Sequence, residues 1–237
     1  MRNNYCQSQL LADRVRAQTL GLGIIALAQG VSFFHAGDDL LRSKSFDNNS
    51  YNSGDWFNLI DFTYQSNNFG VGLPPAWGGN QDNWPVMKPF LGNPDLKPGF
   101  QEIDQARRNF LDLLEIRTSS PLFNLPTAEE VIERVRFYNT GPTDNPALIV
   151  MAISRVSGRG DDSRNGLIVF CNADKVQVVY TPKTEKHADY MSARARLHPV
   201  QRTGADPVVK GSTFDPATGK FNIPARTTAV FVVGDSG

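Results

Sequence analysis

The first regular pattern of apolar residues lies between Gln9 and Gln29. The apolar residues recur at helical spacing at first and then become nearly continuous, at Leu10, Leu11, Val15, Leu20, Ile24, Ile25 and Leu27. This spacing predicts a helix, and the continuous part predicts that its later half is buried. Gly30 then ends the helix. The segment Val31–Phe34 is predicted to be a short strand after it.

Two segments of opposite character follow. Residues 59–100 are rich in Asn, Gly and Pro, which predicts a long irregular segment that is either functional or a wrap over the surface. From Glu102 to Arg117 the apolar residues form one stripe at helical spacing with charged residues opposite, which predicts an amphipathic helix. Ser119, Ser120 and Pro121 break that pattern.

Beyond Ser119 short apolar and β-branched runs alternate with turn residues. The expected strands are residues 134–138, 147–153, 167–171, 176–180, 197–200, 221–223 and 228–233. Short strands at regular spacing with turn signals between them predict an antiparallel β-sandwich. The sequence therefore predicts an α/β part over residues 1–118 followed by an all-β domain over residues 119–237.

Composition narrows the class of protein. The chain has 237 residues, 40% of them hydrophobic, and its acidic and basic residues balance to a net charge of zero. A nucleic-acid-binding protein would be expected to carry a basic patch, so nucleic acid is not an expected partner. Gln18 and Gln29 confine the apolar run to fewer than the roughly 18 residues of a membrane span. The run also resembles a secretory signal ending at Ala26-Leu27-Ala28, but a long polar stretch precedes it.

Cysteine, histidine and glycine give no motif of their own. Cys6 and Cys171 are far apart in a chain that needs no disulfide, and we expect free thiols, with Cys171 acting as a small buried apolar residue. His35, His187 and His198 show no metal-ligand spacing with either cysteine. Gly21 and Gly23 fit a loose dinucleotide fingerprint, but no strand precedes them, so helix packing is their expected use.

Residues 35–58, HAGDDLLRSKSFDNNSYNSGDWFN, concentrate the most specific polar side chains of the chain. Carboxylates, amides, hydroxyls and aromatic rings alternate there within a few residues. Carboxylates accept hydrogen bonds from sugar hydroxyls, amides both donate and accept, and an aromatic face covers the apolar side of a pyranose ring. This composition predicts a sugar-binding loop.

Several long motifs occur in one order along the chain: VSFFHAGDDLLRSKSFDNNSYNSGDWFN, NNFGVGLPP, SSPLFNL, ERVRFYNTGP, LHPV and PARTTAVFV. Together they resemble the C-terminal part of pullulanase-type α-1,6-glucosidases, the starch-debranching enzymes of the α-amylase clan, and most of all their plant limit-dextrinase members. The resemblance covers essentially the whole chain. It implies that residues 1–118 are the incomplete end of a catalytic (β/α)8 barrel, with Val31–Phe34 as its last strand.

The sequence offers no suitable pair of catalytic carboxylates. Glycoside hydrolysis requires two carboxyl groups on opposite sides of the bond. Asp38 and Asp39 are adjacent and point in different directions, so they cannot flank one bond together. The resemblance implies that the catalytic Asp, Glu and Asp lie upstream, the last in a His-Asp-Asn motif that this sequence lacks. No catalytic residue is therefore assigned here, and the chain alone is expected to be inactive.

The resemblance does imply substrate contacts. Asp38 and Arg42 match the family motif that binds glucose hydroxyls, and on a helical turn they would share one face; the alternative is an ordinary exposed ion pair. Asn52 and Asp55 either line the site or only form hydrogen bonds inside the loop. A structural role is expected for His35. Trp77 and Trp84 either pin their segment or stack on glucose.

The expected partners are an α-glucan, such as branched maltodextrin or pullulan, and the missing N-terminal catalytic portion. The alternative is a stand-alone carbohydrate-binding or interaction module. No cofactor is evident; calcium is common among relatives, but the sequence shows no aspartate-rich loop. The resemblance implies a plastid if the parent protein is plant-like, and otherwise the cytoplasm or export.

Overall fold

The computed structural model describes residues 10–154, 166–182 and 195–234. The chain forms two compact units. Unit 1 comprises Met1–Gln18 and His35–Arg107, and unit 2 comprises Thr19–Phe34 and Arg108–Gly237. The predicted domain boundary between Thr118 and Ser119 lies inside unit 2 and stays a prediction.

The helices differ greatly in length. The α-helices are α2 (Leu11–Leu27), α3 (Gly54–Asn58), α4 (Trp84–Leu91), α5 (Phe100–Thr118), α6 (Ala128–Arg134) and α8 (Pro199–Thr203). The short 3-10 helices are η1 (Asp38–Leu40), η2 (Ser50–Asn52), η3 (Gln81–Asn83), η4 (Pro94–Leu96), η5 (Pro121–Phe123) and η6 (Val209–Gly211). The predicted helices over 9–29 and 102–117 are thus confirmed as α2 and α5.

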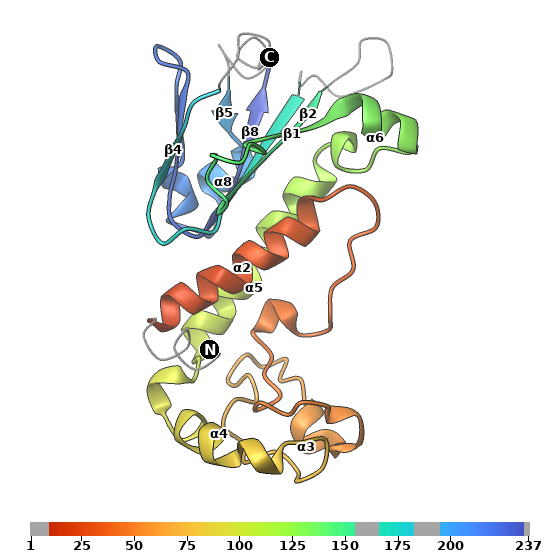
Figure 1. Cartoon of the computed structure of the whole chain (residues 1–237), viewed down its shortest axis with the longest axis vertical. Coiled ribbons are helices and arrows are strands. Elements are labelled where there is room, and N and C mark those ends of the chain that lie inside the picture. Colours follow the sequence, from red (N-terminus) through yellow and green to blue (C-terminus); the bar gives the residue numbers. More distant parts are fainter. Residues whose placement is uncertain (1–9, 155–165, 183–194, 235–237) are drawn as a thin grey trace. The chain divides into compact units, whose positions relative to one another are not determined.

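The strands all lie in unit 2 (Figure 1). They are β1 (Val135–Tyr138), β2 (Leu148–Ser154), β3 (Gly166–Asn172), β4 (Val178–Tyr180), β5 (Arg196–Leu197), β6 (Thr213–Asp215), β7 (Lys220–Ile223) and β8 (Thr227–Val233). A five-stranded sheet has the order β1-β2-β3-β8-β5, and a three-stranded sheet has the order β4-β7-β6. Every pairing is antiparallel, as predicted.

The two sheets pack face to face through an aromatic cluster. Phe170 of β3 lies 4.9 Å from Phe221 of β7 and 5.8 Å from Phe231 of β8, between ring centroids. Phe221 and Phe231 are fully buried, and Tyr180 of β4 closes the cluster. Because strand side chains alternate, Ile168 and Phe170 face this cluster while their neighbours face the other side of the sheet.

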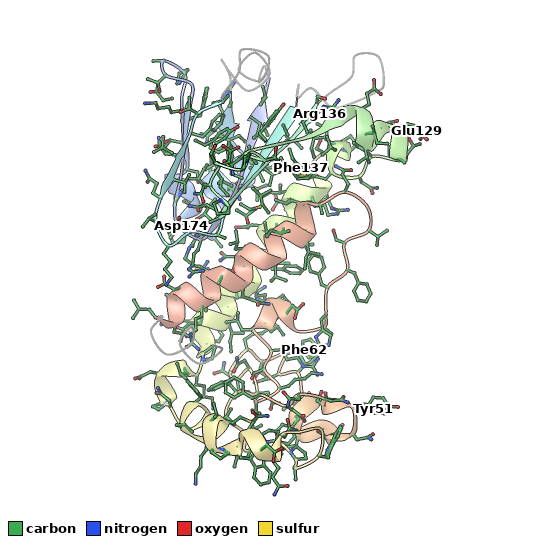
Figure 2. All side chains as sticks on the ribbon, in the orientation of Figure 1. Tyr51, Phe62, Glu129, Arg136, Phe137 and Asp174 are labelled. Carbon is green, nitrogen blue, oxygen red and sulfur yellow. The ribbon has the colours of Figure 1, made fainter. Side chains whose placement is uncertain are left out.

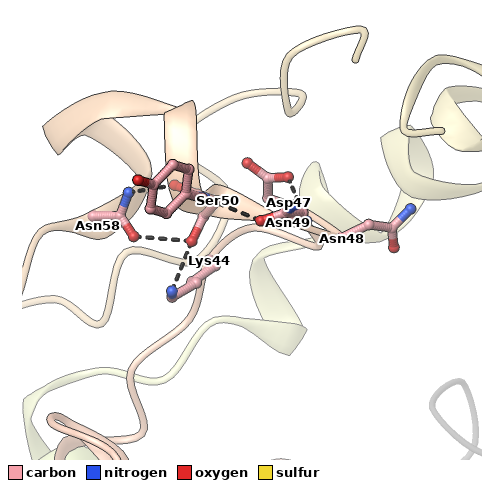
Figure 3. Close-up of a pocket in the computed structure, with 7 residues that line it drawn as sticks. Lys44, Asp47, Asn48, Asn49, Ser50 and Asn58 are labelled. Atoms are coloured by element: carbon pink, nitrogen blue, oxygen red, sulfur yellow. Dashed lines mark hydrogen bonds between the residues drawn. The ribbon is translucent and has the colours of Figure 1, made fainter. Parts of the chain in front are cut away.

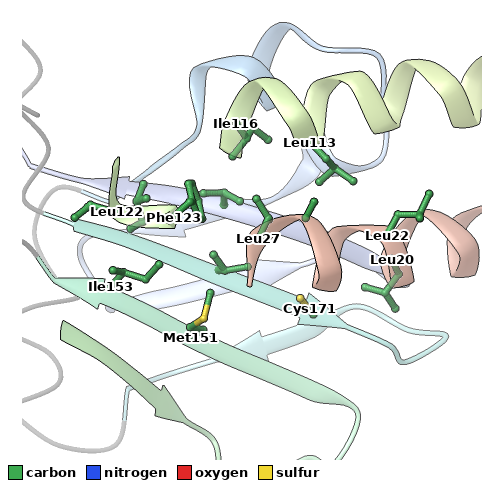
Figure 4. Packing of buried hydrophobic residues seen from close by; sticks show 14 of the residues in the cluster. Leu20, Leu22, Leu27, Leu113, Ile116, Leu122, Phe123, Met151, Ile153 and Cys171 are labelled. Atoms are coloured by element: carbon green, nitrogen blue, oxygen red, sulfur yellow. The ribbon is translucent and has the colours of Figure 1, made fainter. Parts of the chain in front are cut away.

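The other face of the five-stranded sheet is covered by helices. The cluster there combines Leu20, Leu22, Ala26 and Leu27 of α2, Leu113 and Ile116 of α5, Leu122 and Phe123 of η5, and Met151, Ile153, Leu167, Val169, Cys171 and Val230 of the sheet (Figure 4). Strand β3 is therefore buried on both faces. This explains why its sequence is continuously apolar rather than alternating.

The end of α2 corrects one expectation about burial. Leu20, Leu22 and Leu27 are buried, but Ile24 and Ile25 remain exposed. The later half of the helix is therefore buried on one face only, and its apolar residues extend onto a face that is partly exposed.

The segment Val31–Phe34 corrects a second expectation, since it forms no strand. Its side chains alternate as a strand's would: Phe34 packs on Phe110 at 4.9 Å between ring centroids, whereas Val31 and Phe33 are 95% and 85% exposed. A strand needs a hydrogen-bonded neighbour, and the described residues supply none here.

Other differences are local. Of the predicted strand over 197–200 only Leu197 lies in a strand, β5, because Pro199 begins α8 instead. Helix α6 was not predicted, although the Thr127 side chain accepts from the Glu130 N–H as an N-cap. Strand β6 was also missed. Cys6 and His187 lie outside the described residues. No described helix is long and apolar enough to cross a membrane.

Candidate functional site

The polar segment 35–58 lies in unit 1 and folds as a series of tight turns. Gly37, Leu41, Ser45 and Phe46 all have positive φ angles. At Gly37 a Cβ atom would come within 2.7 Å of the Arg42 Cδ, so only glycine fits this turn. The turns bring the two ends of the segment together.

Arg42 joins those ends. Its Nη1 donates to the Ala36 carbonyl at 2.9 Å, and its Nη2 donates to the Asn58 carbonyl. The left-handed Leu41 ends η1 before Arg42, so the expected helical face shared by Asp38 and Arg42 does not form. The Asp38 carboxylate instead accepts from the His35 N–H at 3.1 Å.

The other two predicted site residues lie elsewhere on the segment. Asn52 ends η2 and Asp55 lies in the first turn of α3, and both are exposed. Neither side chain makes a hydrogen bond with another described residue. Internal bonding of the loop is provided by Asn49, Ser50 and Asn58 instead.

An open pocket of about 520 Å³ lies beside these residues (Figure 3). It is lined by Lys44, Asp47, Asn48, Asn49, Ser50, Tyr51 and Asn58. None of Asp38, Arg42, Asn52 and Asp55 lines it. Lys44 and the polar cluster around Asn48 were visible in the sequence, whereas Asn58 was not singled out.

A chain of hydrogen bonds forms one wall of the pocket. The Lys44 ammonium donates to the Ser50 hydroxyl at 2.6 Å, and that hydroxyl donates to the Asn58 Oδ1 at 2.9 Å (Figure 3). The Asn58 amide in turn donates to the carbonyls of Ser50 and Gly54 at 2.8 and 2.9 Å. Asn58 is the last residue of α3, so these bonds fix the Ser50 wall of the pocket to that helix.

Asp47 braces the opposite side. Partial burial of its carboxyl raises the pKa, but hydrogen bonds from Ser53 and Asn80 lower it by more. The Asn49 N–H and the Lys44 ammonium act in the same direction, so the pKa lies below its ordinary value of 3.8. Asp47 is thus held as a carboxylate whose lone pairs are used inside the loop.

The remaining candidates are structural. Cys171 is a buried free thiol, and burial raises its pKa to about 11, as expected of a packing residue. His198 is buried; its Nδ1 accepts from the Val200 N–H at 3.3 Å, and its Nε2 lies 3.1 Å from the Ser119 hydroxyl. The Trp84 indole N–H donates to the Pro74 carbonyl at 2.9 Å, which pins the irregular segment.

Metal binding has no support in the described ranges. No three His, Cys, Asp or Glu side chains gather there in a way that could hold an ion.

Residues 64–233 match a protein family described as α-1,6-glucosidases, pullulanase-type, C-terminal. Among curated proteins, the chain is 49% identical over 232 residues to chloroplastic pullulanase 1 of Arabidopsis thaliana and 35% identical over 225 residues to a pullulanase of Klebsiella pneumoniae. These alignments cover 95% and 93% of this chain but only 23% and 20% of the relatives. The chain therefore spans less than a quarter of their length.

Solved structures of pullulanases are also similar to this chain over nearly its whole length. The crystal structure of PulA from Klebsiella oxytoca superposes with a TM-score of 0.85 at 33% identity, over 97% of this chain and 21% of that protein. A Klebsiella pneumoniae pullulanase complexed with maltotriose gives a TM-score of 0.84 at 33% identity, again over 97% of this chain and 21% of that protein.

Proposed function

The chain belongs to the pullulanase-type α-1,6-glucosidases as their C-terminal part, and from this premise we propose that it completes an enzyme that hydrolyses α-1,6-glucosidic branch points of starch, pullulan or glycogen-derived dextrins. The catalytic carboxylates belong to the N-terminal portion, which corresponds to the larger part of the relatives that this chain does not span. The chain alone is inactive in this proposal, and its partner is that portion.

The observation that carries the proposal is the uncovered segment Val31–Phe34. Its backbone N–H and C=O groups make no hydrogen bond with any described residue, and Val31 and Phe33 project outward. Ile24 and Ile25 of α2 are exposed beside them in the sequence. Exposed apolar side chains are unfavourable in water, and backbone groups without a protein partner can pair with another strand, so together they mark a surface that another part of the protein covers.

Hydrogen bonds from Arg117 fix the chain immediately before the segment Val31–Phe34. Arg117 of α5 donates to the carbonyls of Ala26 and Ala28 at 2.7 and 2.8 Å, and also to that of Gly30. Gly30 itself has a φ of 82°, which ends α2 and redirects the chain. In our proposal the segment leaves this fixed point as the last strand of a (β/α)8 barrel, whose other strands belong to the missing portion.

The sugar contacts follow from the same premise. Asp38 and Arg42 contact glucose hydroxyls, and Asn52 and Asp55 extend the site. In support of this, the Asp38 carboxylate is partly exposed, and both Asn52 and Asp55 have side chains free for a ligand. A relative crystallised with maltotriose supports an α-glucan as the ligand class.

The expectations of calcium binding and of a plastid location come from relatives alone. The described residues bring together no acidic cage, so no step of the proposed function uses calcium. One curated relative is chloroplastic, and a plastid is the proposed compartment if the parent protein is plant-like.

Complementation of pullulan hydrolysis tests the proposal. The purified chain is mixed with the N-terminal portion of a pullulanase relative that ends where this chain begins, and new reducing ends are measured. We expect no hydrolysis from either part and hydrolysis from the mixture. Activity of the chain alone would contradict the assignment of the catalytic groups.

Variants connect that result to the surface. Phe33→Glu places a charge on the uncovered segment and is expected to prevent complementation. Val179→Glu, on an exposed position of β4, is the matched control and should complement like the unchanged chain. If the mixture is inactive but the chain alone binds pullulan as a stable monomer, the alternative of a stand-alone binding module replaces the proposal.

A further inference from the structure

We propose that the pocket between Lys44 and Asn58 binds one glucosyl unit, with the Tyr51 ring stacked on the sugar and Lys44, Asn48 and Asn49 donating to its hydroxyls. The choice of an α-glucan as ligand rests on the proposed function. The assignment of the residues rests on the pocket itself, which does not include Asp38, Arg42, Asn52 or Asp55.

The polar atoms of the lining fall into two groups. Those of Ser50, Asn58 and Asp47 are used by hydrogen bonds within the loop. Among the described residues, the Asn48 amide, the Asn49 Nδ2 and the Tyr51 hydroxyl have no partner. Lys44 uses one of its three ammonium N–H groups on Ser50. The first group fixes the shape of the pocket, and the second remains available to a ligand.

Tyr51 supplies the surface that distinguishes a sugar from other polar ligands. Its side chain is 88% exposed and projects away from the ribbon (Figure 2), although its backbone is fixed in η2. An exposed aromatic ring gains by covering the apolar face of a pyranose, and its hydroxyl remains free to bond the ring substituents.

The charge of the pocket favours a neutral ligand. The Lys44 ammonium is close enough to lower the pKa of the Asp47 carboxyl, so the cation and the anion of the lining partly offset each other. A phosphate or carboxylate ligand would meet that carboxylate as well as the ammonium. A polyhydroxyl ligand carries no charge and can use donors and acceptors together.

The donors are also positioned in advance. The Asn48 N–H donates to the Asn80 Oδ1 at 3.1 Å, and the Asn49 Oδ1 accepts from the Tyr51 N–H at 3.3 Å. Asn80 is fully buried and also donates to Asp47. Little backbone ordering is therefore needed on binding, which favours measurable affinity even for a single glucosyl unit.

The test is a titration of the complete 237-residue chain with maltotriose, followed by isothermal calorimetry and by the NMR shifts of residues 44–58. We expect saturable binding, with the largest shifts in the pocket. Tyr51→Ala should weaken binding by about tenfold because the stacking surface is lost. Tyr51→Phe keeps the ring and should weaken binding by about threefold at most.

Phe62→Ala is the matched control, since Phe62 is an exposed aromatic residue of the same unit that does not line the pocket (Figure 2). It should bind maltotriose like the unchanged chain. Equal affinity of the Tyr51→Ala variant, absence of saturable binding, or tighter binding of inorganic phosphate than of maltotriose would each overturn the proposal.

These outcomes are separable from those of complementation. Maltotriose binding that depends on Tyr51, together with failed complementation, would leave the pocket assigned and overturn only the proposed function. Successful complementation with binding that ignores Tyr51 would do the reverse.

Discussion

The interiors of the two units differ in their balance of apolar and polar groups. Unit 2 is built on two apolar clusters that meet the two faces of one sheet. Unit 1 buries fewer apolar side chains, among them Phe57, Phe69 and Met87, and its turns are fixed by amides: Asn67, Asn68 and Asn80 are nearly inaccessible and donate to the carbonyls of Leu41, Trp56 and Pro75 at 2.7 to 3.0 Å. Burial of apolar area is non-directional, whereas buried amides stabilise only if each bond is made.

The balance of buried groups determines which substitutions each unit tolerates. In unit 2 the cost of a substitution follows the volume removed from the core. In unit 1 it follows the number of polar groups that lose their partner, even where little volume changes. Substitutions in the two interiors and at the glycines of α2 test this contrast.

Phe170→Ala should have the largest effect. The ring contacts Tyr180, Phe221 and Phe231, and its loss should lower the free energy of unfolding by about 3 to 5 kcal/mol. Denaturant unfolding measures this. Phe137→Ala removes a largely exposed ring on β1 and should change stability by less than about 0.5 kcal/mol. Equal losses in the two variants would contradict the assigned core.

Asn80→Ala should produce the largest effect in unit 1. The buried amide donates to Asp47 and Pro75 and accepts from the Asn48 N–H, so three partners lose their bond. We expect a cost of about 2 kcal/mol. Amide hydrogen exchange should quicken in residues 47–58 and stay unchanged in β3 and β8. Faster exchange in β3 would show that the contrast between the units is wrong.

Two glycines of α2 give a matched pair of smaller effects. A Cβ at Gly23 would lie 2.6 Å from the Thr228 hydroxyl oxygen, whereas a Cβ at Gly21 would meet nothing within 4 Å. Gly23→Ala should therefore destabilise by about 1 kcal/mol or more. Gly21→Ala should stabilise by up to about 1 kcal/mol, because alanine favours helix. Thermal melts of the two variants should shift in opposite directions.

Acid should loosen the pocket loop before it affects the sheets. Since the folded-state pKa of Asp47 lies below 3.8, its carboxylate stabilises the fold above that pH, and the contribution is lost as pH falls through the lower folded value. NMR shifts of the Asn49 and Ser53 amides should report this step. Asp47→Asn should remove it, and an unchanged acid transition in that variant would assign the step to another group.

The elements with regularly spaced apolar residues were predicted from the sequence. Helices α2 and α5 and most strands follow from the spacing of apolar residues, and the signal for β3 was strong because both its faces are buried. The three-residue β6 and the seven-residue α6 are too short to give such a signal. The strand expected over Val31–Phe34 failed for a different reason, since a strand exists only with a neighbour.

The candidate site was less predictable. Its polar residues were found by composition, but their grouping depends on backbone conformations such as the φ of 55° at Leu41, which ended the helical face expected for Asp38 and Arg42. Asn58 closes the wall of the pocket through Ser50, eight positions away. The spacing of the residues does not predict the Ser50–Asn58 bond, because that bond depends on the turns between the two residues.

The open segment Val31–Phe34 also governs how the chain behaves at high concentration. An apolar extended stretch with unpaired backbone groups is a template on which another extended chain can align. In a solution of this chain alone, the most abundant candidate is the same segment of a second molecule. We therefore expect these four residues, rather than the well-packed sheets, to limit solubility, and a single charge in place of Val31 to reduce aggregation.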